Sequence, residues 1–207
     1  LDPDENKVIL AAVSEGASPN APYFRVGLTD QYYTDAAKIA GQDSDVALAN
    51  AGKLAQGFMV KTTRTVGRFE VFLTLLGTLT TGATVTLSVF SNSAGAPNAA
   101  LSNGVSAAVK ATEITAAGGW VQFDFLSGVV LTANTQYWLV LEPAGTYAAE
   151  ADGSNQIQWG VDVSDTKYSL GNWSVYAGSW TADMTKDGLF RACSYLYPRA
   201  ALELTGR

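Results

Sequence analysis

The chain has 207 residues, of which 47% are hydrophobic and 15% are charged. This composition supplies the core of one large domain and excludes an intrinsically disordered chain. The net charge is −6 and the 13 basic residues are scattered, which argues against a nucleic-acid partner, because phosphate contacts need clustered Lys and Arg. No run of about 20 apolar residues exists, so we expect no membrane insertion.

The chain has no histidine and a single cysteine, Cys193. These counts exclude catalysis by Ser-His-Asp or Cys-His groups, zinc or haem held by histidine, and an intrachain disulfide. Paired carboxylates can hydrolyse glycosides, but any chain with 19 acidic residues contains such pairs. We therefore expect a protein that is not an enzyme.

Residues 1–53 lack a sustained hydrophobic period. Lys7–Val13 predicts an apolar strand that ends at Ser18–Pro22, because proline removes a ladder donor and restricts its neighbours. Tyr23–Leu28 predicts a second short strand. Asp35–Asn50 reads as a loop, with one helical turn as the alternative within it. We expect residues 1–53 to form a less regular N-terminal arm that contacts neighbouring molecules.

From residue 54 onward, strand signals recur with turn residues between them. Thr84–Phe90 and Trp120–Phe125 alternate apolar and polar residues, and no long helical period separates them. Residues 54–207 are therefore predicted to form an all-β, antiparallel sandwich of jelly-roll type. Further strands are expected at Leu54–Val60, Val66–Leu76, Gln136–Leu141, Gln156–Trp159, Leu189–Tyr195 and Ala200–Leu204, with Ser91–Asn98 as a surface loop. The expected core includes Val85, Leu87, Val89, Val121, Phe123, Phe125, Leu139 and Leu141, together with Trp120 and Trp138.

Several short motifs follow one another between Leu54 and Tyr195. They are Gln56-Gly-Phe58, Val89–Pro97, Trp120–Phe123, Leu131–Leu141, Trp159, Trp180 and Asp187–Arg191. In this order they resemble choice-of-anchor-type and carbohydrate-binding-like jelly-roll domains of bacterial surface proteins and phage virion proteins. The resemblance implies a module without enzymatic activity at a virion or extracellular surface.

Two functions agree with this resemblance. The first is a structural and attachment module of a phage tail fibre, baseplate or capsid decoration, which contacts other virion proteins, further copies of itself and host glycans. The second is a carbohydrate-binding module of a secreted bacterial enzyme or adhesin. Leu1, in place of an initiator Met, predicts a processed or excised piece.

Aromatic residues gather in a polar stretch near the C-terminus. Trp173 and Trp180 lie within Ser169–Trp180, and with Tyr168 and Tyr176 they are candidates for a glycan-binding platform, because an exposed ring can stack on the C–H face of a pyranose. The alternative is a structural loop folded over the sandwich edge and held by its own aromatic residues.

Acidic residues gather in the same region of the sequence, namely Glu150, Asp152, Asp162, Asp165, Asp183 and Asp187. Calcium prefers several carboxylate and carbonyl oxygens, so Asp162 and Asp165 are candidate calcium ligands. The alternative is that these acids are solvated loop residues, because the EF-hand arrangement is missing.

Overall fold

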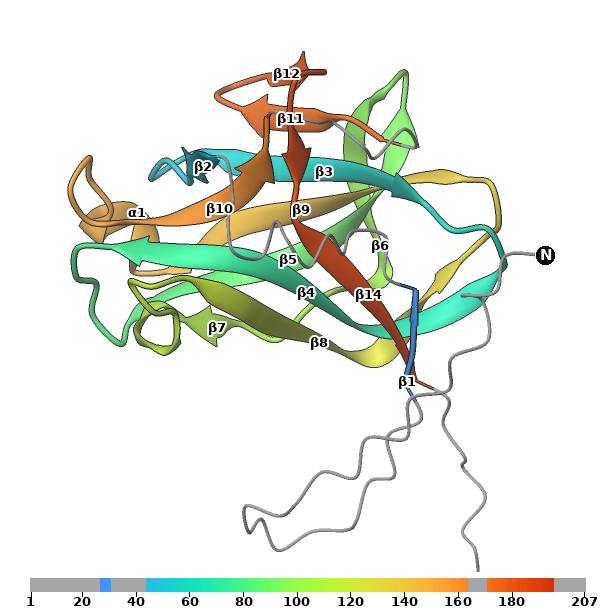
Figure 1. The fold of residues 1–207 in the computed structure, drawn as a ribbon, viewed down its shortest axis with the longest axis horizontal. Helices are drawn as coiled ribbons and strands as arrows, with labels where there is room; N and C mark the ends of the chain where they lie inside the picture. The colour runs from blue at the N-terminus through green and yellow to red at the C-terminus, as the bar shows by residue number, and fades with distance from the viewer. Residues whose placement is uncertain (1–26, 31–43, 164–170, 196–207) are drawn as a thin grey trace, which may run out of the picture.

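The computed structural model describes residues 27–30, 44–163 and 171–195, with side chains over 44–163 and 171–192. Within these ranges the chain forms two packed antiparallel sheets, which confirms the predicted all-β sandwich (Figure 1). The helical segments of the described chain are short, η1 (Ala111–Glu113) and α1 (Tyr147–Glu150). None of the described helices has the length and apolar character needed to cross a membrane.

The first sheet, sheet A, is built around one long strand, β4 (Arg64–Leu76). One edge of β4 pairs with β8 (Gly119–Leu131), and the other pairs with β14 (Phe190–Tyr195) and then with β10 (Gln156–Asp162). The shorter strands β1 (Gly27–Asp30), β2 (Ser44–Ala47) and β13 (Asp187–Gly188) pair with β14 and β10.

The second sheet, sheet B, runs in the order β12, β11, β3, β9, β5, β6, with β7 beside β5. Its central strand, β9 (Gln136–Gly145), has apolar side chains on both faces, as its sequence predicts. The others are β12 (Trp180–Asp183), β11 (Trp173–Tyr176), β3 (Lys53–Met59), β5 (Ala83–Ser93), β6 (Ala96–Val105) and β7 (Val109–Lys110).

The main core lies between the sheets and is rich in aromatic rings. Phe58 of sheet B packs edge-on against Phe69 of sheet A, with ring centroids 5.4 Å apart, and Phe69 packs against Phe125 in the same way at 5.7 Å. The predicted core residues are buried except Val121 and Trp120, which are half-buried. Both lie near the start of β8, where an edge strand offers packing partners on one side only.

Three segments predicted to be loops contain strands instead. Ser91–Asn98 is the end of the β5–β6 hairpin, which turns at Ala94 and Gly95, both with positive φ. The described part of Ser169–Trp180 belongs to the β11–β12 hairpin, and Asp35–Asn50 contains β2. β2, β11 and β12 have four residues each, and the ends of β5 and β6 that meet at their hairpin are rich in Ser, Ala and Asn, so their alternation is weak in the sequence.

The described parts of residues 1–53 pair with the sandwich. β1 pairs with β14 and β2 with β10, while Leu48 is fully buried in the main core. The Tyr147 hydroxyl donates to the Leu48 carbonyl at 2.8 Å and accepts from the Ile157 amide at 2.9 Å. The predicted strands at 7–13 and 200–204 lie outside the described residues, and the division at residue 53 stays a prediction.

Candidate ligand-binding face

Sheet B is rolled over its outer face. Its edge strands, β12 and β6, are five strand spacings apart along the sheet, about 24 Å if the sheet were flat. Nevertheless, Cα atoms of β12 and β6 come within 8 Å of each other. At the top of Figure 1 the β11–β12 hairpin and the β5–β6 hairpin both rise above β3. The outer face of sheet B is therefore concave.

A second, small apolar cluster fills the base of this concave face. Ala55 of β3 and Trp138 and Val140 of β9 are buried there, with Phe90 and Trp180 packed against them. Leu139 and Leu141 belong to the main core, as strand alternation requires of their positions. Trp138 is thus buried as expected, but outside the main core, and its indole N–H donates to the Asn92 Oδ1 at 2.9 Å.

A polar group lies at the centre of the same face. The Lys53 ammonium is 2.5 Å from the Glu142 Oε1, and the Ser88 hydroxyl donates to the Glu142 Oε2 at 2.7 Å. The Lys53 Nζ also lies 5.8 Å from the ring centroid of Phe90 and 5.9 Å from that of Tyr176, within the range of a cation–π attraction. These contacts fix one cation and one anion side by side among aromatic rings.

Tyr176 and Trp180 form the aromatic rim of this face. They are directly opposite in the β11–β12 pair, so both side chains project to the same side. Their ring centroids are 5.2 Å apart with planes tilted by 60°, and both residues are half-buried. This rim leaves aromatic surface accessible beside Lys53 and Glu142.

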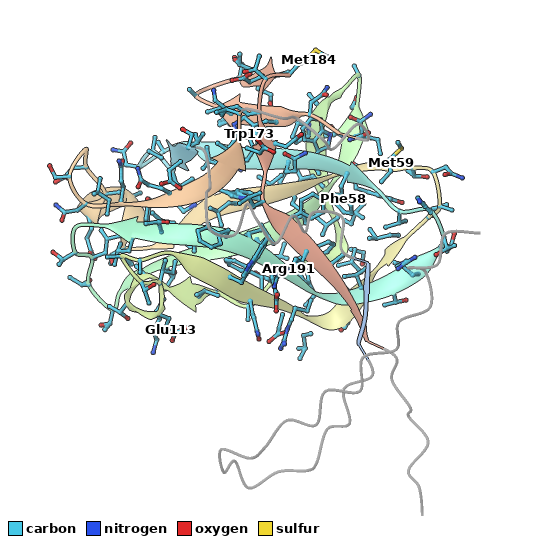
Figure 2. The ribbon with its side chains drawn as sticks, in the orientation of Figure 1. Phe58, Met59, Glu113, Trp173, Met184 and Arg191 are labelled. Atoms are coloured by element: carbon cyan, nitrogen blue, oxygen red, sulfur yellow. The ribbon has the colours of Figure 1, made fainter. Side chains whose placement is uncertain are left out.

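Trp173 belongs to the main core instead. It lies three residues before Tyr176, so strand alternation turns it inward, where it is fully buried and packs edge-on against Trp159 at 5.2 Å. A Cβ at Gly188 would lie 2.5 Å from its ring, so glycine is needed there. Figure 2 shows Trp173 below β11. The ring faces of Trp173 are inaccessible, so Trp173 does not contribute to the binding face. Tyr168 lies outside the described residues.

Two shallow hollows adjoin the ends of β3. One, of about 310 Å³, is lined by Trp138 and by side-chain amides, which can donate to and accept from hydroxyls. The other, of about 260 Å³, lies beside Lys53 and Tyr176 between small turn residues. The amides of the first are Asn92, Gln136 and Asn172.

Several of the acidic residues organise loops. The Asp152 carboxylate accepts from the Ser154 and Asn155 amides, both at 2.7 Å, and Glu150 accepts from the Thr80 amide at 2.7 Å. These hydrogen bonds lower the pKa of Asp152, while hydrogen bonds from Thr146 and Thr80 lower that of Glu150. The acids therefore hold the turns between strands.

The candidate calcium ligands are placed only in part. Asp162 is buried on β10 opposite Asp187 of β13, and Asp165 lies outside the described residues. Within the described ranges, no group of three or more His, Cys, Asp or Glu residues is arranged to hold a metal ion. Calcium binding at Asp162 and Asp165 stays a prediction.

The chain matches no protein-family model and no curated protein sequence.

The concave face also contains residues that sequence reasoning missed, chiefly Lys53, Phe90 and Glu142. One signal of this second apolar surface was available in the sequence, because successive residues of β9 between Gln136 and Glu142 are apolar and therefore lie on both faces of the strand. A strand of this kind must cover a second apolar surface as well as the main core.

Proposed function

We propose that this protein is an attachment module without catalytic activity, carried on a phage virion or another extracellular surface, and that it contacts glycans through the concave face of sheet B. The observation that supports this most is the half-exposed Tyr176–Trp180 pair beside the Lys53–Glu142 ion pair. Aromatic rings stack on the C–H face of a sugar, and polar groups beside them bind its hydroxyls.

The contacts of Glu142 favour binding over hydrolysis. A glycosidase needs one carboxyl that donates a proton and a second that acts as base or nucleophile. Both oxygens of Glu142 accept hydrogen bonds, one from Lys53 and one from Ser88. An acceptor held in this way is suited to orienting sugar hydroxyls.

A glycan array with the full chain tests this function. We expect bound glycans to be lost with Trp180→Ala, because the stacking surface is removed. Trp120→Ala is a matched control, since Trp120 is also half-buried but lies on sheet A, where it packs edge-on against Phe72 at 5.7 Å. Binding that survives both Trp180→Ala and Tyr176→Ala, or the absence of any bound glycan, would contradict the proposal.

We expect each site to bind a sugar weakly and several sites together to bind strongly. A few stacking and hydrogen-bonding contacts must offset the ordering of a flexible glycan. Several copies on one particle raise the overall avidity without new contacts. The alternative, a carbohydrate-binding module of a secreted enzyme or adhesin, uses the same face. Mass spectrometry of purified virions distinguishes the two, because only a virion protein would be detected there.

A second candidate function, assembly with further copies of this chain, is favoured by exposed apolar residues on β8. Leu126 is 95% exposed and Val130 is 65% exposed, which leaves apolar surface on an edge strand of sheet A. We expect Leu126→Ser with Val130→Ser to shift sedimentation towards the monomer. Met184→Ser is the control, because Met184 is 75% exposed and lies beyond the β11–β12 hairpin (Figure 2). Equal sedimentation of all variants would exclude this interface.

A further inference from the structure

We infer that the concave face of sheet B selects an uncharged pyranose and rejects sugars that carry a carboxylate or sulfate. This inference rests on the proposed function and adds the chemical class of the ligand. Its basis is the Lys53–Glu142 pair, which places equal and opposite charges at the centre of the face.

The pair keeps unused hydrogen-bonding capacity. An ammonium has three donors, and Lys53 directs one of them to Glu142. A carboxylate has about four acceptor positions, and Glu142 uses two, for Lys53 and Ser88. The side chains are 33% and 20% exposed, so both remain accessible. Adjacent hydroxyls of a neutral sugar fit this set, since each hydroxyl both donates and accepts.

An anionic sugar fits the same set poorly. Glu142 already neutralises Lys53, so a second anion would either displace Glu142 or lie next to its charge. Because both side chains are partly buried, this repulsion is screened less than between fully exposed charges. Lys110, a further cation of sheet B, is on β7 opposite Thr84 of β5.

The aromatic rim places the ligand against this pair. The Tyr176 ring neighbours both the Lys53 ammonium, at 5.9 Å, and the Trp180 ring, at 5.2 Å. A pyranose stacked on the rim therefore has hydroxyls directed at Lys53 and Glu142. Ring stacking supplies affinity for sugars in general, and the ion pair supplies the discrimination by charge.

Matched sugar pairs that differ only in oxidation at C6 test the selectivity. The probes are methyl β-galactoside against methyl β-galacturonide and cello-oligosaccharides against β-1,4-linked glucuronate oligomers, measured by array and then by calorimetry. We expect neutral members to bind at least about tenfold more tightly than acidic ones, the loss expected when one hydrogen bond to a charged group is replaced by repulsion. Binding of the neutral sugars should not change with salt concentration.

Glu142→Gln separates charge from shape. It removes the anion but keeps a side chain of similar size, so the charge of Lys53 loses its partner. We therefore expect the ratio of affinities for neutral over acidic sugars to fall by about tenfold. Glu113→Gln is the matched control, with the same change in net charge at an exposed position of η1, near the lower edge of the sandwich in Figure 2. Unfolding midpoints of both variants show whether the fold is retained.

The outcomes distinguish this inference from the function on which it rests. Preferred binding of acidic sugars that is lost with Trp180→Ala would overturn the neutral selectivity and leave the glycan face in place. An unchanged ratio in Glu142→Gln would exclude the ion pair as the selective element. The absence of any glycan binding would overturn the proposed function itself.

Discussion

Gln56 joins the two sheets through a buried hydrogen bond. It is fully buried on β3, where its Oε1 accepts from the Gly188 amide of β13 at 2.6 Å and its Nε2 donates to the Gly57 carbonyl at 2.9 Å. Most buried polar groups are paired in this way, because an unpaired one forfeits its hydration without compensation. The cross-sheet contact also holds Gly188 where Trp173 leaves no room for a side chain.

Replacing Gln56 tests the energy of this contact. Gln56→Leu keeps most of the volume but leaves the Gly188 N–H buried without an acceptor, so we expect the free energy of unfolding to fall by about 1–3 kcal/mol. Urea denaturation measures the change. Gln122→Leu, at an exposed position on β8, serves as control and should change stability by less than about 0.5 kcal/mol. Equal effects of the two substitutions would show that the cross-sheet bond contributes little.

At the scale of elements, the β11–β12 hairpin explains why aromatic residues of one segment divide between two environments. Trp173 and Val175 face the main core, whereas Ser174 and Tyr176 face outward. The same hairpin ends in a turn organised by Asp183, whose carboxylate accepts from the Thr185 amide at 2.9 Å and lies 2.5 Å from the Lys186 ammonium. The hairpin thus carries both a core anchor and the aromatic rim.

The Asp183 turn predicts a pH dependence of stability. Hydrogen bonds from Lys186 and Thr185 lower the pKa of Asp183 from 3.8 to about 2. A carboxyl whose pKa is lower in the folded state stabilises the fold above pH 3.8, and this contribution is lost as the pH falls towards 2. We expect Asp183→Asn to be less stable than the parent above pH 3.8 and to approach it at lower pH. Denaturation curves that stay parallel over this interval would contradict the turn geometry.

At the scale of the whole molecule, one apolar strand organises two hydrophobic surfaces. β9 directs Leu139 and Leu141 into the main core and Trp138 and Val140 into the cluster under the roll of sheet B. A sheet that buries apolar residues on both faces must cover the second face, and here its own edge strands do so. The concave face and its rim follow from that covering.

The sequence by itself determined the class of fold and most of the long strands. Alternation in β5 and β8 and the apolar run in β9 are local patterns, so they identify strands and nearly all of the expected core without knowledge of strand pairing. The same patterns indicated an aromatic segment around Trp173–Trp180. They could not divide that segment between core and rim, because its strands are short and rich in polar residues.

Only the tertiary structure decided which side chains meet. Lys53, Ser88 and Glu142 come from three strands, and Lys53 lies 89 residues from Glu142 along the chain, so their contact depends on strand order and register. The concave shape depends on the approach of β12 to β6, which no local period encodes. Pairing between distant strands is a property of the whole sheet, and for that reason the candidate site became visible only in the fold.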